Sequence, residues 1–163
     1  MKSILVPLRG HDHEAEAIRL ALRLGSLDQA HVRCLVTRPS IETLAVAFAR
    51  QGMADSEAVL REAEATARRA EHRLRWMVQA ALAELGAPEV GPREPAAAGF
   101  SCAIATMDAL LAEATAAEAP FHDLVVYEPC RGPWHDLLLA PQAVDDPVLE
   151  AVLCSAARPV LTG

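Results

Sequence analysis

The sequence has few aromatic residues, no paired cysteines and no excess of basic charge, and each absence excludes a class of protein. Aromatics make up 4% of the 163 residues, while 52% are hydrophobic, so we expect an interior of Ala, Val and Leu. The formal net charge of -7, with basic and acidic residues interleaved, argues against a nucleic-acid partner. The first apolar run stops at Pro7, too short for a signal peptide or a membrane span. We therefore expect a cytoplasmic protein that contacts neither nucleic acid nor membrane.

Cysteine and histidine do not occur in patterns that indicate a metal site. The four cysteines show no CxxC pair and are expected to be reduced thiols. In a predicted loop, Arg131 beside Cys130 would favour the thiolate, so Cys130 is the candidate for a reactive cysteine. His11-Asp12-His13 places two imidazoles around a carboxylate, but no third ligand is indicated, and Asp12 can cap a helix instead. We expect no metal, and the lack of a GxSxG nucleophile elbow argues against a hydrolase.

Apolar runs bounded by Gly and Pro alternate with segments of helical periodicity. Helices are expected from about Asp12 to Gly25, over an ambiguous stretch within 40–54, from 55 or 56 to 85, from a cap at Asp108 to just before Pro120, and over about 148–157. The helix ending at residue 85 is unusually long because no Gly or Pro interrupts it. Strands are predicted at 3–8, 32–37, 101–106, 124–127 and 159–162. This alternation predicts one α/β domain over 1–163, with a five-stranded parallel doubly wound sheet and flanking helices.

The order and spacing of three segments resemble the universal stress protein family over nearly the whole chain. These segments are Ile4-Leu5-Val6-Pro7 with Gly10, the strand Asp123-Leu124-Val125-Val126, and the ending from Val148-Leu149-Glu150-Ala151-Val152-Leu153 to Arg158-Pro159-Val160-Leu161. The resemblance implies a five-stranded parallel sheet of the adenine-nucleotide alpha hydrolase-like type, dimerisation and, in one branch, ATP binding. In that branch an Asp follows the first strand, and a GxxG with a later Gly-Ser or Gly-Thr cradles the phosphates.

The sequence departs from the ATP-binding pattern at each of these places. Arg9 stands where the Asp is expected, and Tyr127, Glu128 and Pro129 replace the start of the glycine loop. Ala140 and Pro141 replace the Gly-Ser, and Asp145 and Asp146 follow. Proline offers no amide donor, and the added carboxylates would repel a triphosphate. The residues of the vestigial pocket are Leu8, Arg9, Gly10, Val36, Tyr127, Arg131 and Gly132, of which Arg131 and Gly132 could still receive one phosphate or another anion.

These features favour a stress-response or regulatory module that acts through protein contact and holds no cofactor, rather than an enzyme. The interface is predicted at Pro159, Val160, Leu161 and Thr162, because an apolar strand at a sheet edge is costly to leave bare. The partner is a second copy of the chain or, if this is half of a tandem protein, a second such domain. Two alternatives stay open: an ATP- or AMP-binding protein with an atypical phosphate loop and slow ATP hydrolysis, and a flavodoxin-like electron-transfer domain.

Overall fold

The structure is a computed structural model that describes residues 1–10, 14–50, 52, 57–87, 89–91, 99–128, 148, 150, 154 and 159–162. Its centre is a sheet of six parallel strands in the order β3-β4-β2-β1-β5-β6. The strands are β1 (Ser3–Leu8), β2 (His31–Thr37), β3 (Glu89–Val90), β4 (Ser101–Met107), β5 (Leu124–Tyr127) and β6 (Val160–Thr162). The five predicted strands are confirmed. The sixth, β3, has two residues in the turn-rich stretch for which the sequence predicts no element.

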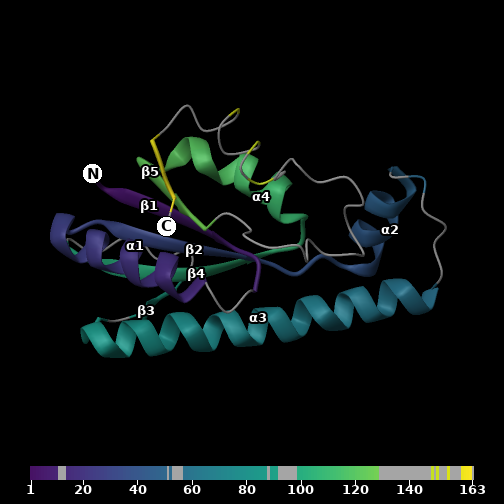
Figure 1. Ribbon diagram of the computed structural model, residues 1–163, viewed down its shortest axis with the longest axis horizontal. Helices are drawn as coiled ribbons and strands as arrows, with labels where there is room; N and C mark the ends of the chain where they lie inside the picture. Colours follow the sequence, from purple (N-terminus) through teal and green to yellow (C-terminus); the bar gives the residue numbers. More distant parts are fainter. Residues whose placement is uncertain are drawn as a thin grey trace.

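The helices α1 (Glu14–Asp28) and α3 (Glu57–Leu85) cover one face of the sheet, and α4 (Leu111–Glu118) covers the other (Figure 1). The larger core lies between the sheet and the first pair, where Ile18 and Leu22 of α1 meet Leu74 and Val78 of α3. A second core under α4 includes Leu35 and Tyr127. Because both faces are covered, β1 is continuously apolar from Ile4 to Leu8 rather than in alternation.

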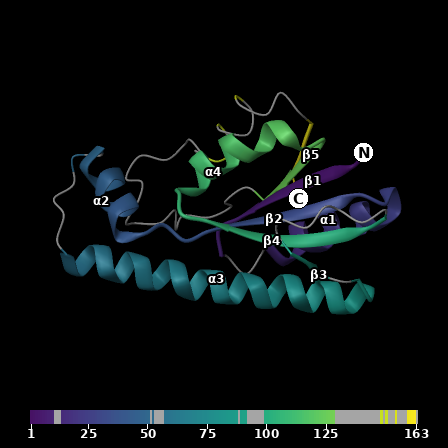
Figure 2. The ribbon, with the colours of Figure 1, turned by 180° about the vertical axis from the view of Figure 1, so that it is seen from behind.

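The long helix α3 has 29 residues and therefore spans about 43 Å. It runs past the sheet, where α2 (Ile41–Arg50) packs against it (Figures 1 and 2). Leu44 and Phe48 of α2 form a small separate core with Leu60 of α3. The N-terminal half of α3, which extends beyond the sheet, is therefore partly covered by α2 of the same chain.

Of two predicted helix ends, the structure corrects one and confirms the other. Helix α1 does not end at Gly25 but continues to Asp28, and Gln29 follows with a φ of 54°. Gly25 is needed for close packing, because a Cβ there would lie 2.5 Å from Val32 Cγ2. The end of α3 at Leu85 is confirmed, and Gly86 follows it at a φ of 63°.

The C-terminal part of the chain is described only at some positions. Val148, Glu150 and Cys154 are helical, as the prediction for 148–157 requires. After η1 (Ala119–Phe121) and β5, the predicted loop 128–147 lies outside the described residues except for Glu128. Cys130 and the segment from Pro129 to Asp146 are therefore not described.

Candidate functional site

The carboxyl ends of the central strands meet at one edge of the sheet. Leu8 of β1 pairs with Val36 of β2, and Val36 pairs with Thr106 of β4. The strand order reverses between β1 and β5. Open α/β sheets bind ligands beyond the carboxyl ends at such a reversal, so the space after Leu8 and Tyr127 is the first candidate site.

The structure brings several of the predicted pocket residues to this edge. Leu8, Val36 and Tyr127 are buried at the ends of their strands, and Arg9 and Gly10 follow β1 directly. Arg131 and Gly132 lie outside the described residues, so their predicted role is not tested.

Arg9 and Tyr127 contact each other across the reversal between β1 and β5. The Arg9 guanidinium donates a hydrogen bond to the Tyr127 hydroxyl, and its central carbon lies 5.2 Å from the centroid of the Tyr127 ring. Tyr127 is 1% exposed. A cation and an aromatic ring of the chain itself therefore lie at the reversal.

Glu14, at the start of α1, is a site residue that sequence reasoning missed. Its carboxylate accepts the backbone N–H of Arg9 at 2.5 Å and that of Gly10 at 2.8 Å, and the residue is 2% exposed. Backbone amides in a turn before a helix are the usual donors to a bound anion. Here a carboxylate of the same chain takes them. The one signal in the sequence is an acid four residues after Gly10, which is equally expected from the helix dipole alone.

Gly10 lets α3 approach the turn between β1 and α1. Its φ is 99°, and a Cβ there would lie 2.7 Å from the Cβ of Ala70. No other residue combines this backbone conformation with this contact at low cost. The turn is therefore held from the α3 side as well as by Glu14.

A buried carboxylate connects α3 to the ends of β2 and β4. Glu71 lies 3.2 Å from Arg38 Nη1 and 3.2 Å from Arg75 Nε, and accepts the Thr106 hydroxyl at 3.1 Å. Burial raises the pKa of Glu71, but the bonds from Thr106 and Arg75 and the charge of Arg38 outweigh it, and the pKa is lowered. The alternation of Arg and Glu along α3 predicts a solvated, ion-paired face that includes Glu71. For Glu71 this prediction is wrong, because the residue is buried and, besides Arg75 of its own helix, contacts Arg38 after β2 and Thr106 of β4.

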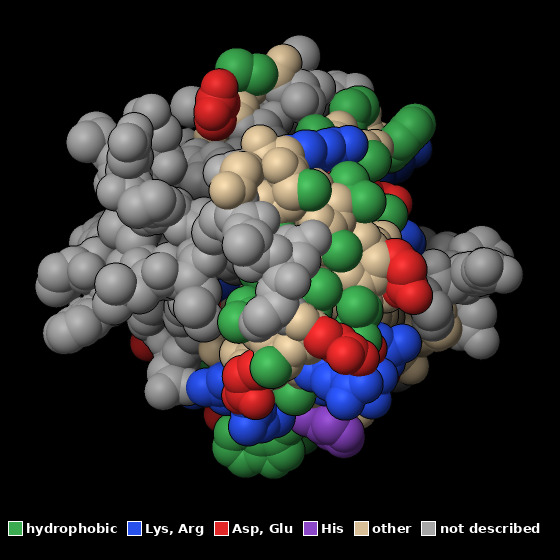
Figure 3. Space-filling model, turned by 90° about the vertical axis from the view of Figure 1, so that its right-hand side faces the viewer, with side chains coloured by type: hydrophobic (Ala, Val, Ile, Leu, Met, Phe, Trp, Pro, Cys, Tyr) green, Lys and Arg blue, Asp and Glu red, His purple; other side chains and the backbone are tan. Residues whose placement is uncertain are grey.

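The other acids of that interpretation do lie on exposed ion pairs along α3. Glu57 pairs with Arg61, Glu64 with Arg68, and Glu62 with Arg69. Figure 3 views the end of the molecule toward which α2 and the start of α3 extend, and acidic and basic side chains lie side by side there. Among the described residues of this face, acidic side chains therefore interrupt the basic ones.

Asp108, after β4, caps α2 rather than α4. Its carboxylate accepts the backbone N–H of Ser40 at 2.7 Å and the hydroxyl of Thr43 at 3.0 Å. These bonds, led by the one from Ser40, lower the pKa of Asp108. Helix α4 begins after Leu110 without a side-chain cap, so the prediction that Asp108 caps it is wrong. The bond from Asp108 instead joins the segments that follow β2 and β4.

The predicted interface residues form one edge of the sheet. Within β6, Val160 is half-buried and Leu161 is 38% exposed, and Pro159 and Thr162 are exposed. Val125 of β5 donates to the Pro159 carbonyl at 3.1 Å. The strand is therefore held on its inner side, and no described strand pairs with its outer side.

Two further searches cover only the part of the chain that the structure describes. No group of three or more His, Cys, Asp or Glu side chains is placed to hold a metal ion there, and His11-Asp12-His13 falls outside it. None of its helices is both long and apolar enough to cross a bilayer.

Comparison with solved structures identifies the fold. The chain is similar to the universal stress protein UspA from Lactobacillus plantarum, with a TM-score of 0.57, 18% identity, and coverage of 99% of this chain and 96% of that one. A universal stress protein family member from Burkholderia pseudomallei gives 0.54, 18%, 99% and 95%, and one from Archaeoglobus fulgidus gives 0.52, 14%, 99% and 97%. No family model and no curated protein matches the sequence.

Proposed function

The chain has the universal stress protein fold over nearly its full length, and we propose that it is a stress-response or regulatory module of that family. In this proposal it acts through dimerisation and protein contact and does not bind ATP in the family's usual pose. The observation that carries the proposal lies beyond the carboxyl ends of β1 and β5. There, side chains of the chain itself occupy the space and accept the backbone N–H groups that a nucleotide would need.

Both contacts at the reversal disfavour a nucleotide. The backbone N–H groups of Arg9 and Gly10 already donate to Glu14. A phosphate would have to displace this buried carboxylate or lie beside it, at a cost in electrostatic repulsion. The contact of Arg9 with Tyr127 fills the neighbouring space with a side chain where the ATP-binding branch has the Asp that meets adenine. Because the chain's own side chains occupy this site, we favour a function that depends on contact with other proteins over one that depends on a bound nucleotide.

The edge strand β6 supports self-association as that function. An exposed strand edge with an apolar side chain pairs readily with a second strand, and Leu161 supplies such a side chain. Pairing of two β6 strands would continue the sheet from one protomer into the next. The proposed interface consists of Pro159, Val160, Leu161 and Thr162.

Sedimentation of the wild-type chain with two matched variants tests the dimer. We expect a dimer at tens of micromolar for the wild type and a monomer for Leu161→Asp, because the added charge would lie in the pairing edge. Leu27→Asp is the control, since Leu27 is 80% exposed at the end of α1, away from β6. A monomeric wild type would refute the proposed interface, and so would a Leu161→Asp dimer as tight as that of Leu27→Asp.

A thermal shift with ATP and magnesium tests the closed site. Binding at a concentration one hundred times the Kd would stabilise the fold by about 2.7 kcal/mol, which corresponds to roughly 5 to 10 °C for a chain of this size. We expect no shift. A clear stabilisation, or adenine nucleotide released when the purified protein is denatured, would refute the closed site and favour a nucleotide-binding protein.

A further inference from the structure

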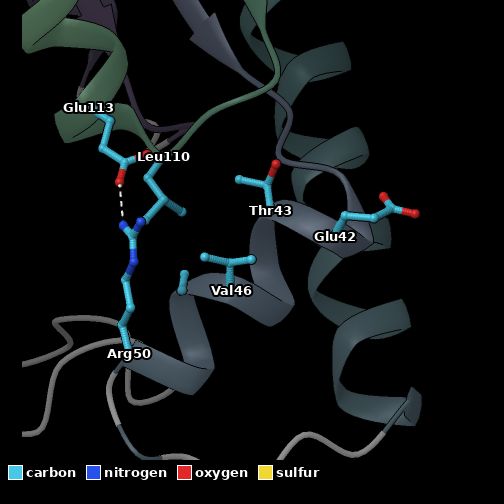
Figure 4. Close-up of a pocket in the computed structure, with 7 residues that line it drawn as sticks. Glu42, Thr43, Val46, Arg50, Leu110 and Glu113 are labelled. Carbon is cyan, nitrogen blue, oxygen red and sulfur yellow. Dashed lines mark hydrogen bonds and ion pairs between the residues drawn. The ribbon is translucent and has the colours of Figure 1, made fainter.

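A pocket lies between α2 and the start of α4, beyond the carboxyl ends of β2 and β4 (Figure 4). Its volume is about 290 Å³. Pockets for drug-sized ligands have volumes of about 300 to 1,000 Å³, so this one lies at the small end of that range. Its lining residues are Glu42, Thr43, Val46, Ala47 and Arg50 from α2, and Leu110 and Glu113 from the α4 side.

Helix α2 packs one apolar side against α3. Leu44 and Phe48 meet Leu60 there. On the other face Val46 and Ala47 line the pocket, and Val46 is 53% exposed. Packing of a helix on one side requires one apolar stripe. The Val46 side chain lies outside that stripe and is accessible to a ligand, whereas Ala47 is 6% exposed and already packed.

The walls of the pocket are held in place without a ligand. The bonds from Ser40 and Thr43 to Asp108 fix the first turn of α2 to the segment that precedes α4. The contact of Phe48 with α3 holds α2 from behind. A site whose walls are fixed in advance loses little conformational entropy when it binds.

An ion pair spans the pocket above its apolar residues. Arg50 Nη1 lies 3.2 Å from Glu113 Oε1 (Figure 4), and the two side chains are 70% and 53% exposed. Exposed pairs of this kind are weak and open readily. Once open, this pair presents one cationic and one anionic group beside Val46, Ala47 and Leu110, while the second carboxylate of the lining, Glu42, points away from the pair (Figure 4). This arrangement is complementary to a small molecule that has both charges beside an apolar group.

We propose that this pocket binds a free aliphatic α-amino acid. The α-carboxylate of the ligand accepts hydrogen bonds from the Arg50 guanidinium, and its α-ammonium group donates to the Glu113 carboxylate. The hydrocarbon side chain lies on Val46, Ala47 and Leu110. The ligand thus replaces one ion pair of the protein with two pairs that it makes itself, and covers the exposed Val46 side chain.

Three probes of similar hydrocarbon size test the proposal by titration into the ¹⁵N-labelled full chain, followed by amide NMR. L-Leucine carries both charges, 4-methylpentanoate lacks the ammonium group, and 3-methylbutylamine lacks the carboxylate. We expect L-leucine to shift the amide signals of α2 and of the start of α4, and each single-charge probe to bind about two- to fivefold more weakly, since one exposed ion pair is lost.

Variants distinguish this site from nonspecific binding. Arg50→Gln and Glu113→Gln should each weaken L-leucine binding about two- to fivefold, the loss of one exposed ion pair. Arg61→Gln should not change it, because it breaks a comparable exposed pair on α3 outside the pocket. The spectra themselves report whether each variant is folded.

Four outcomes would overturn the proposal. The first is that L-leucine leaves the signals of α2 and α4 unmoved. The second is equal binding of all three probes, which would make the pocket a purely apolar contact site. The third is that the amine or the acid binds as well as leucine, which would indicate a ligand of one charge. The fourth is unchanged leucine binding by Arg50→Gln.

Discussion

The Glu71 carboxylate gives the sharpest test of how α3 is attached to the sheet. Glu71→Gln keeps the size of the side chain and removes its negative charge. The side chain is 12% exposed and contacts two arginines and a hydroxyl. Hydrogen bonds to charged groups contribute about 1.5 to 3 kcal/mol each, but Arg38 and Arg75 are 53% and 38% exposed, and water replaces much of what they lose. We expect the free energy of unfolding to fall by about 1 to 3 kcal/mol.

Urea unfolding followed by circular dichroism measures this change. Glu62→Gln is the control, because it removes the same charge from α3 where both members of the pair with Arg69 are mostly exposed. The control should lie within about 0.5 kcal/mol of the wild type. If Glu71→Gln is no less stable than Glu62→Gln, the carboxylate does not attach α3 to the sheet in the way the structure indicates.

The pH dependence of the same variant supplies a second readout. The pKa of Glu71 is lowered from its ordinary value of 4.5 in the folded chain. The unfolded chain therefore takes up the proton first as the pH falls, so the stabilisation by Glu71 is complete above about pH 4.5 and is lost as the pH falls through the folded pKa. The deficit of Glu71→Gln should shrink in that range. An equal deficit at pH 7 and pH 4 would contradict the charge-based explanation.

Three further predictions address other parts of the fold. Burial lowers the pKa of His122 from 6.5, so the contribution of His122 to stability is complete above about pH 6.5 and decreases below it. The urea midpoint should therefore drop less between pH 7.5 and 5.5 for His122→Gln than for the wild type, and equal drops would refute this. Gly10 has a φ of 99°, and a Cβ there would lie 2.7 Å from Ala70, so Gly10→Ala should lower the free energy of unfolding by roughly 2 to 4 kcal/mol in urea. Gly52→Ala is the control and should lower it by about 1 kcal/mol, because a Cβ at Gly52 meets nothing within 4 Å. Equal losses would contradict the close packing at Gly10. The hydrogen bond between the Cys34 and Cys102 thiols and the burial of Cys34 raise the pKa of Cys34. A polar thiol reagent should therefore label the exposed Cys154 first in the native chain, and equal labelling rates by mass mapping would contradict the burial of Cys34.

The elements of this fold are largely readable from local patterns. The apolar run of β1 and the stretch of α3 without Gly or Pro each identify their own structure, because burial on two faces and helix propensity act over neighbouring residues. Alternation of strands and helices then predicts a parallel sheet. The two-residue strand β3 was not predictable, because it depends on pairing with β4 rather than on its own composition.

The position of the candidate site could be predicted from the sequence, but the contacts within it could not. The sequence predicts Arg9 and Tyr127 as site residues because they lie at the carboxyl ends of two apolar strands, where such sheets bind ligands. That the two residues contact each other is a property of the arrangement of β1 beside β5. Gly25 was likewise interpreted from local sequence alone. A glycine after an apolar stripe predicts a helix end, but in the structure Gly25 lies inside α1, where its packing against Val32 leaves no room for a Cβ.

The sequence by itself therefore determined the succession of elements and the long helix. Only the tertiary structure decided what the acidic residues do. Glu14 takes the amides of the turn before it, Glu71 binds arginines, and Asp108 caps a helix that precedes it in the chain. A carboxylate has the same local sequence signature in water and in a buried network, and the partners that distinguish the two come from elements the sequence does not place side by side.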